Sequence, residues 1–226
     1  MNEEKTEGIV LKAIPFKEND RILSLFTPDR GVMSLYVRGL SKKKPALVNL
    51  TTPLCRAEYH FRKGRSDLYR FIDGTILDLH LPMRRSYHHL EYAGKMLQAI
   101  LKSQMPGKKS EGLYYLLISY LKKLSDLSFP ETLWVSFELK LLKYEGLLAI
   151  HETCLSCGKE KASHISNGES RCTKCSDPMS LSLSDLDWKT LQVLSHTRTF
   201  DPFLNLELSS SLTQAIDALF KTQYDF

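Results

Sequence analysis

Two pairs of cysteines constrain this chain more than any other feature of its sequence. The segment CLSCGKEKASHISNGESRCTKC holds four of the five cysteines, as Cys154, Cys157, Cys172 and Cys175, with fourteen residues between the pairs. Each Cys-x-x-Cys turn places two sulfurs on one side of a tight knuckle, and two such knuckles can surround one Zn²⁺ tetrahedrally. We therefore expect one structural zinc ion, because four protein ligands leave no open coordination position.

Other uses of these cysteines fit the sequence less well. A thioredoxin-like redox site would need one pair in a βαβ context, which the pattern lacks. An iron–sulfur cluster could take four thiolates, but paired knuckles around a turn-rich spacer with Asn167-Gly168 favour zinc. A zinc deaminase would show His-x-Glu and Pro-Cys-x-x-Cys, whereas here Glu152 follows His151 directly. His164 lies inside the spacer as an alternative ligand, and Cys55, alone in an apolar run, is expected to be a buried small residue.

The chain is long enough to bury a hydrophobic core, with 226 residues and 42% hydrophobic residues. No stretch approaches the roughly 20 apolar residues of a membrane helix. The opening MNEEKTEGIVLK is acidic and has no apolar segment typical of a secretory signal. We expect a soluble, cytoplasmic protein without membrane contact, whose cysteines stay reduced and available to metal.

The positive charge is concentrated in the first part of the chain. Net charge is +4 over residues 1–80, +4 over 81–150 and −3 over 151–226. Residues 38–70 include nine basic residues and only two acidic ones, and this excess of positive charge suggests contact with a polyanion. The candidate nucleic-acid-binding residues are Arg38, Lys42, Lys43, Lys44, Arg56, Arg62, Lys63, Arg65 and Arg70. The lysine triplet suits phosphate contact without base reading.

Residues 7–80 read as five short strands. The runs are 7–16, 21–27, 32–39, 52–62 and 68–79, rich in Val, Ile, Leu, Phe and Tyr and separated by turn signals. Five strands in about 75 residues predict a small barrel, most economically of the OB type, although an SH3-like barrel has similar spacing. Aromatics alternate with arginine in Tyr36-Val-Arg38, Tyr59-His-Phe61-Arg62 and Tyr69-Arg70-Phe71. Some of these rings must fill the barrel, and others could stack on bases.

A helical pattern replaces the strands after Pro82. Apolar residues recur at helical spacing over 83–104, 112–127 and 130–146, with Pro130 suited to a first turn and Gly146 to a C-cap. Two further helices are expected after the cysteine segment, one following Ser184 and one over about 210–221. The fold class is thus α+β and multidomain: a five-stranded OB-type β-barrel, then an α-helical domain carrying a four-cysteine zinc-ribbon insertion.

The sequence shows no catalytic motif, so we expect a binding protein and not an enzyme. The GKKS segment at 107–110 lacks the upstream glycine of a phosphate-binding loop, and no Gly-x-Ser-x-Gly occurs. Two rivals stay open. One is an RNA- or transcription-associated protein that pairs an OB barrel with a zinc ribbon, and the other is a zinc hydrolase, which four thiolates disfavour.

The order of these modules resembles one bacterial family. The matching features are EGIVLK near the start, the Thr27–Gly31 turn, Arg38-Gly39 before a lysine-rich loop, the RKGRSDLYR hairpin, and FELKLLKYEG leading into CLSC…CTKC. Along essentially the whole chain they resemble the recombination mediator RecO. The resemblance carries Cys154, Cys157, Cys172 and Cys175 over directly as zinc ligands, and it carries the DNA contacts over only as a region.

The resemblance implies a function and a domain division. It implies an OB-fold nucleic-acid-binding domain over 1–80, an α-helical domain over 81–150 and 180–226, and a zinc ribbon over 151–179. The family takes part in recombinational DNA repair: it binds single- and double-stranded DNA, anneals complementary strands, and assists recombinase loading onto strands coated by single-strand-binding protein. The implied partners are RecR, the acidic C-terminal tail of single-strand-binding protein, and RecF as a further candidate, in the cytoplasm at the nucleoid.

Overall fold

The chain forms two compact units, Met1–Ser125 and Asp126–Phe226. The structure is a computed structural model that describes residues 3–64 and 68–224. The first unit contains the barrel together with helices α2 (Tyr87–Ser103) and α3 (Glu111–Leu124). The second unit contains the four-cysteine ribbon. The expected domain boundaries at residues 80, 150 and 179 stay predictions.

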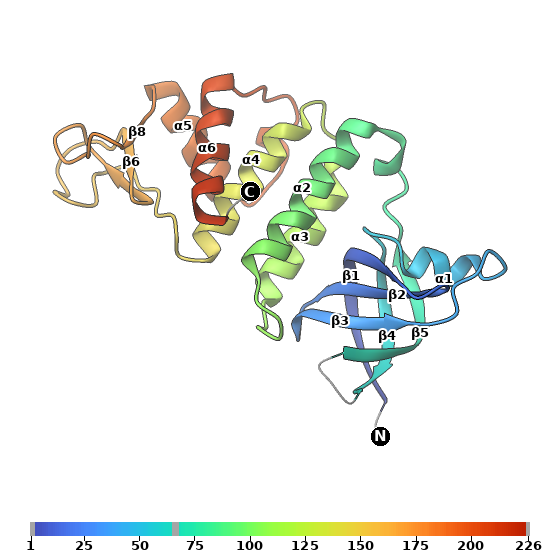
Figure 1. The fold of residues 1–226 in the computed structure, drawn as a ribbon. Coiled ribbons are helices and arrows are strands. Elements are labelled where there is room, and N and C mark those ends of the chain that lie inside the picture. Colours follow the sequence, from blue (N-terminus) through green and yellow to red (C-terminus); the bar gives the residue numbers. More distant parts are fainter. Residues whose placement is uncertain (1–2, 65–67, 225–226) are drawn as a thin grey trace. The chain divides into compact units, whose positions relative to one another are not determined.

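A closed barrel of five strands forms the first part of the first unit (Figure 1). The strands are β1 (Glu3–Phe16), β2 (Asp20–Thr27), β3 (Gly31–Val37), β4 (Arg56–Arg62) and β5 (Leu68–Asp78). They are hydrogen-bonded in the order β1-β2-β3-β5-β4, and β4 pairs with β1 to close the barrel. All pairs are antiparallel except β3 with β5. The predicted five-stranded OB-type barrel followed by helices is confirmed.

Alternation along the strands decides which side chains fill the barrel. On β3, Met33, Leu35 and Val37 are buried, while Ser34 between them is exposed. On β4, Ala57, Tyr59 and Phe61 point inward in the same way. Tyr59 and Phe61 are therefore core residues, and the Tyr59 hydroxyl donates to the Leu50 carbonyl at 2.9 Å. Cys55 is fully buried in this core, as its apolar surroundings in the sequence indicated.

A short helix, α1 (Pro45–Leu50), lies between β3 and β4, where the sequence indicated only a lysine-rich loop. Pro45 occupies its first turn, which needs no backbone N–H donor. Because the helix has only six residues, it is shorter than any periodic apolar pattern that the sequence could display.

Two helices complete the first unit. A 3₁₀ turn, η1 (Met83–Arg85), precedes α2 (Tyr87–Ser103), and α3 is Glu111–Leu124. The helix expected from residue 83 begins later because the Ser86 backbone is extended and its side chain caps the N–H of His89 at 3.4 Å. Helix α2 contacts β1, and α3 contacts β2. The ring of Tyr114 packs 5.7 Å from that of Phe26, which explains why Phe26 is fully buried although it points out of the barrel.

The loop between α2 and α3 is fixed against the turn between β2 and β3. Pro106 forms bridges with Gly31 and Val32, and the N–H of Gly107 donates to the Val32 carbonyl at 3.1 Å. At the base of the loop, the buried Ser110 hydroxyl donates to the Gln104 side-chain oxygen at 2.8 Å. The loop is therefore held against the first residues of β3.

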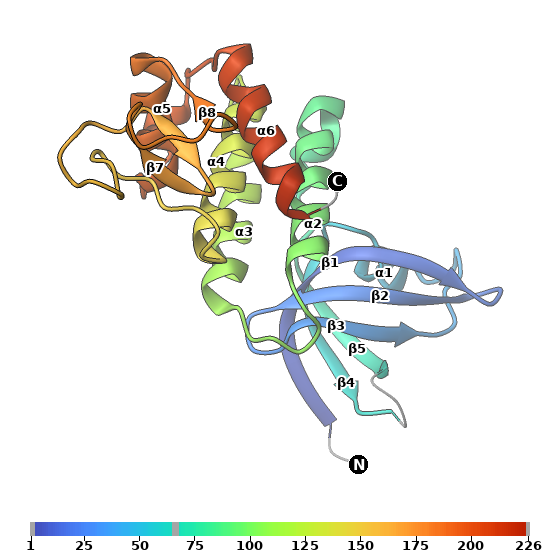
Figure 2. The ribbon, with the colours of Figure 1, turned by 60° about the vertical axis from the view of Figure 1, so that its left-hand side comes forward.

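Helix α4 (Pro130–Tyr144) is the centre of the second unit, and it packs against both α5 (Asp185–His196) and α6 (Ser210–Tyr224) (Figure 2). A 3₁₀ turn, η2 (Asp201–Phe203), connects α5 to α6. Helix α4 ends as predicted, because Gly146 follows it with a φ of 74°. Helix α5 also begins as predicted, since the Ser184 hydroxyl accepts from the N–H of Asp187 at 3.1 Å.

Polar side chains of α4 bind backbone carbonyls of the segments around it. The Ser136 hydroxyl donates to the Leu194 carbonyl and the Lys140 ammonium to the Thr197 carbonyl, each at 2.7 Å. These are carbonyls at the end of α5, where the helix itself offers no donor. Burial lowers the pKa of Lys140 to about 8, consistent with its position in this packed interface.

His80 is the buried titratable group at the junction of β5 and η1. Its ring is 4% exposed, and Nδ1 lies 2.9 Å from the Leu54 carbonyl, which requires Nδ1 to be the donor. Burial lowers the pKa of His80 below its usual value, Arg56 and Arg84 add to this effect, and Asp78 and the Leu54 carbonyl oppose it. The fold therefore favours the neutral ring.

The first prediction concerns stability against pH. Because the unfolded His80 titrates near its ordinary pKa of about 6.5 and the folded one below it, its contribution is complete above about pH 6.5. As pH falls below that value, the free energy of unfolding decreases by up to about 1.4 kcal/mol per pH unit, until the folded pKa is passed. The variant His80→Asn, whose residue tolerates the observed φ of 50°, loses this dependence in urea unfolding. His60→Asn, on a half-buried strand position, keeps it. If the free energy of unfolding of wild type and of His80→Asn changed equally with pH, a lowered pKa of His80 would be contradicted.

The second prediction concerns the docked loop. Gly31 has a φ of +61°, and a Cβ there would lie 2.0 Å from the Lys108 carbonyl oxygen. Gly31→Ala is expected to destabilise the first unit by at least about 2 kcal/mol, since the left-handed backbone adds to the clash. Gly107→Ala is the matched control, with a φ of +76° and no atom within 4 Å of its Cβ, and should cost about 1 kcal/mol. Amide exchange of Gly107 should accelerate in Gly31→Ala, and an unchanged rate would argue against the docking.

Candidate nucleic-acid interface and metal centre

A row of side chains crosses the outside of the barrel. The strand register pairs Ile14 with Ile22, Ile22 with Tyr36, Tyr36 with Arg70, and Arg70 with Arg62. Directly paired residues project from the same face of a sheet. Ile14, Ile22, Tyr36, Arg70 and Arg62 therefore form one row, here called the outer row, which changes from apolar to aromatic to cationic. It lies on the β2–β3 face that OB-type barrels use for oligonucleotides.

The ring of Tyr36 is held in place within the outer row. Its hydroxyl donates to the Asp20 carboxylate, which also accepts the N–H of Gly39 at 3.1 Å. These two hydrogen bonds lower the pKa of Asp20, and nearby Arg38 and Lys17 contribute. The ring of Phe16 meets that of Tyr36 edge-on, with centroids 5.8 Å apart. A half-buried aromatic ring with a fixed orientation can receive a base with little loss of side-chain entropy.

The predicted lysine loop lies close to the β1–β2 turn. The N–H of Leu40 donates to the Asn19 carbonyl at 2.7 Å, which ties the two segments together. Lys42, Lys43 and Lys44 are exposed on this loop, as is Arg38 at its start. Their charges therefore gather at the end of the barrel where Tyr36 and Phe16 lie.

The other basic candidates lie in three kinds of position. Arg62, Lys63 and Arg70 are exposed, Arg62 and Arg70 within the outer row and Lys63 directly after it. Arg65 lies outside the described residues. Arg56 is different, because its side chain is only 19% exposed and is engaged inside the unit.

Arg56 belongs to a network that joins β1, β4 and α3. The Nε of Arg56 and the hydroxyl of Tyr114 each donate to Glu7 Oε1 at 2.7 Å. Burial raises the pKa of Glu7, but the bonds from Arg56 and Tyr114 outweigh it, so the pKa is lowered overall. The charge of Arg56 is therefore balanced by a carboxylate. No local sequence pattern predicts this network, because Tyr114 is 107 residues from Glu7.

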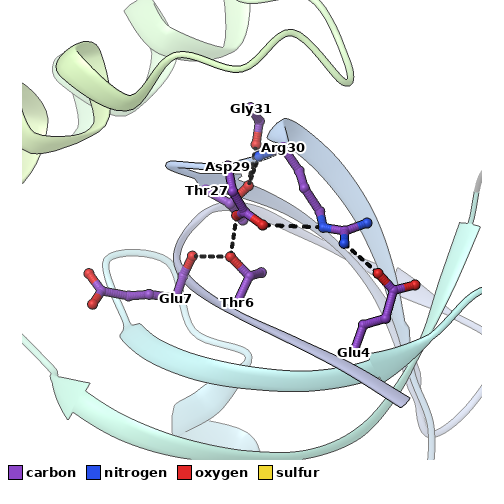
Figure 3. Close-up of polar contacts among 7 residues, drawn as sticks. All are labelled: Glu4, Thr6, Glu7, Thr27, Asp29, Arg30 and Gly31. Atoms are coloured by element: carbon purple, nitrogen blue, oxygen red, sulfur yellow. Dashed lines mark hydrogen bonds and ion pairs between the residues drawn. The ribbon is translucent and has the colours of Figure 1, made fainter. Parts of the chain in front are cut away.

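Arg30 is the second arginine held by carboxylates, and Figure 3 shows its side chain between Asp29 and Glu4. Its Nε lies 3.4 Å from Asp29 Oδ2, and its Nη2 donates to Glu4. The guanidinium also lies over the Phe61 ring, 5.4 Å from the centroid. In the same turn, the Thr27 hydroxyl donates to the Gly31 carbonyl at 3.0 Å and accepts the Arg30 N–H at 3.2 Å (Figure 3). Arg30 is not among the basic residues predicted from the sequence to bind nucleic acid.

The four predicted cysteines come together in the second unit. The sulfurs of Cys154, Cys157, Cys172 and Cys175 all lie within 4.8 Å of one another. A tetrahedral Zn²⁺ with bonds of about 2.3 Å would hold its sulfurs roughly 3.8 Å apart, so the cluster fits one ion with little movement. Among the described residues, no other group of His, Cys, Asp and Glu gathers in this way.

The ribbon holds these sulfurs through two knuckles and a hairpin. Strands β6 (His164–Ser166) and β7 (Glu169–Arg171) are joined by Asn167-Gly168, both at positive φ as a two-residue hairpin requires. A short strand, β8 (Leu181–Ser182), pairs with β6. Gly158 closes the first knuckle by donating its N–H to the Cys154 carbonyl at 2.9 Å. His164, the alternative ligand, is not part of the cluster.

The knuckle backbone favours thiolates at the cluster. Burial opposes ionisation of Cys154, but backbone N–H groups of Cys157, Cys172 and Ser156 lower its pKa to about 6. The pKa of Cys157 is lowered by the N–H groups of Lys159 and Glu160. A hydrogen bond with Cys172 raises the pKa of Cys175 to about 12, because crowded sulfurs cannot all ionise without a cation among them.

The fold and the cluster define a class: proteins that join an OB-type barrel to a helical unit with a four-cysteine metal module. The family model described as recombination protein O N terminal matches residues 1–80, and that described as recombination protein O C terminal matches residues 84–226. The chain belongs to the RecO family.

Individual relatives agree with the family models. The DNA repair protein RecO of Clostridium perfringens is 32% identical over 213 residues, covering 91% of this chain and 85% of the relative. The protein of the same name from Chlamydia pneumoniae is 28% identical over 216 residues, covering 94% and 85%. Among the described residues, no helix has the length and apolar character needed to cross a membrane.

Proposed function

We propose that this chain is a non-enzymatic DNA-binding mediator of recombinational DNA repair. Its task would be to bind single- and double-stranded DNA, anneal complementary strands, and assist recombinase loading with RecR onto strands coated by single-strand-binding protein. The observation that carries this proposal is the outer row, in which the fixed ring of Tyr36 stands beside Arg70 and Arg62. An aromatic platform flanked by cations is how OB-type surfaces hold a single strand without reading its sequence.

The division of labour follows the charge of the segments. The barrel domain, residues 1–80, would bind DNA through Arg38, Lys42, Lys43, Lys44, Arg62, Lys63 and Arg70. The basic helical segment over 81–150, net +4, would bind the acidic tail of single-strand-binding protein. RecR, and RecF as a further partner, would act with the protein in the cytoplasm at the nucleoid. We assign Arg56 to the framework of the barrel because Glu7 already balances its charge.

The alternative is an RNA- or transcription-associated protein built from the same modules. Membership of a family of DNA repair proteins favours DNA over RNA. A competition between DNA and RNA oligonucleotides of one sequence separates the two, together with an assay of annealing on protein-coated strands. Strong preference for RNA without DNA annealing would support the rival.

The third prediction tests DNA binding through its salt dependence. Changing Lys42, Lys43 and Lys44 together to alanine should weaken binding of a single-stranded oligonucleotide. It should also flatten the slope of log K against log salt by up to about 2, because each lost phosphate contact removes about 0.7. Fluorescence anisotropy between about 50 and 300 mM NaCl measures both effects.

The matched control removes the same charge elsewhere. Lys143, Lys189 and Arg198 are exposed residues of the second unit, and changing them together to alanine should leave the slope unchanged. Equal slopes for wild type and the lysine-loop variant would remove the loop from the DNA surface.

We further propose that the cysteine cluster holds one structural Zn²⁺. Cys154, Cys157, Cys172 and Cys175 would be its ligands, and the ion would supply folding free energy to the ribbon. Four thiolates would leave no position for a substrate, which disfavours a hydrolase.

The fourth prediction tests the metal. Purified protein should contain one zinc per chain by elemental analysis, and Cys172→Ser should lose it, because three thiolates hold zinc less well than four. Cys55→Ala, which changes the buried cysteine of the barrel core, should retain it. Oligonucleotide affinity should change little in Cys172→Ser, since the proposed DNA surface lies in the other unit. A full complement of zinc in Cys172→Ser would contradict the ligand set.

A further inference from the structure

A hollow of about 520 Å³ opens beside β3 in the first unit. The β2–β3 turn, Lys63 just after β4, Tyr69 of β5 and the α2–α3 loop supply its walls. Its lining includes Arg30, Ser34, Lys63, Tyr69, Pro106 and Gly107. Its volume is within the range of small-ligand sites, roughly 300 to 1,000 Å³, and exceeds the space that one phosphate ion fills.

The hollow continues the outer row. Ser34 lies on the same face of β3 as Tyr36, two residues or roughly 7 Å away along the strand. Lys63 directly follows Arg62, the last member of the outer row. A strand lying along Tyr36 and Arg70 therefore reaches the rim of the hollow at Ser34. Tyr69 enters the hollow from the inner face of the barrel, because it pairs with the buried Leu35.

The charges of the hollow favour a nucleotide over a bare anion. Glu4 and Asp29 already balance Arg30, whose guanidinium lies 5.9 Å from the centre of the Tyr69 ring. Arg30 thus stiffens the wall and leaves little net attraction for a phosphate at that point. The exposed Lys63 remains as a cation, while Tyr69 and Pro106 offer apolar surface.

The walls are rigid enough to receive a base. The ring of Tyr69 meets that of Phe61 edge-on at 5.2 Å. The opposite wall is held by the hydrogen bond from Gly107 to Val32 and by the close approach of Gly31 to Lys108. A preformed slot between an aromatic ring and a fixed loop can accept an unstacked base at low entropic cost.

We infer that this hollow binds one nucleotide of single-stranded DNA, with the base between Tyr69 and the loop at Pro106 and a phosphate at Lys63. The inference rests on the proposed function and extends it from a surface to a defined subsite. It assigns Tyr69 and Ser34 to DNA binding, and the basic residues predicted from the sequence include neither.

The fifth prediction fills the hollow. Ser34→Trp should weaken binding of an oligo-dT strand by roughly 5- to 100-fold, the effect of losing one stacked base. The slope of log K against log salt should flatten by no more than about 0.7, because only the phosphate contact at Lys63 is lost. Thr75→Trp places the same residue on an exposed position of β5 outside the hollow and should bind as wild type does. Wild-type affinity in Ser34→Trp would overturn the inference.

A second measurement on the unaltered protein guards against misfolding of Ser34→Trp. An oligo-dT strand carrying 5-iododeoxyuridine is photocrosslinked to wild-type protein, and mass spectrometry locates the attachment. Crosslinks at Tyr69 support the inference. Crosslinks at Tyr36 without any at Tyr69 would overturn the hollow while leaving the proposed function in place, and failure of wild type to bind the strand at low salt would overturn both.

Discussion

The parallel pairing of β3 with β5 is the contact on which the rest of the first unit depends. It aligns Ser34–Tyr36 with Leu68–Arg70, and these three residue pairs complete the barrel between β3 and β5. The same pairing places Arg70 next to Tyr36, and the antiparallel pairing of β4 and β5 adds Arg62 beyond it. The outer row therefore exists because the barrel closes, since its members come from separate parts of the chain.

This dependence sets what the sequence could predict. Strands, helices and the cluster of four cysteines follow from local patterns: alternation, helical period, and two Cys-x-x-Cys knuckles that each supply two neighbouring sulfurs. Alternation also explains why Tyr59 and Phe61 are core residues while Tyr36 is on the outer face. The register of β3 on β5 is a long-range property, and so is the partner of Arg56. In the alternation along β4, Arg56 holds the same outward position as Arg62. Composition could not separate these two arginines, whereas the position of Glu7 and Tyr114 does.

The distinction between balanced and exposed cations bears directly on DNA binding. An arginine paired with a carboxylate, as Arg30 is with Glu4, must give up that partner before it can neutralise a phosphate and release counterions from the DNA. Lysines on an exposed loop, such as Lys42 and Lys43, are hydrated and mobile, so a phosphate replaces only water and small ions. Affinity should therefore follow the loop and the outer row and not the total charge of residues 1–80.

The metal module belongs to the opposite electrostatic class. Residues 151–226 carry net charge −3, and four thiolates around the proposed divalent cation would add further negative charge. Such a module would repel a polyanion, and its stability would depend on the proposed ion, because the β6–β7 hairpin and β8 are too short to bury a core of their own. Ionic strength and chelation should thus act on different units of one chain. Salt should weaken DNA binding by the barrel, and loss of the metal should unfold the ribbon.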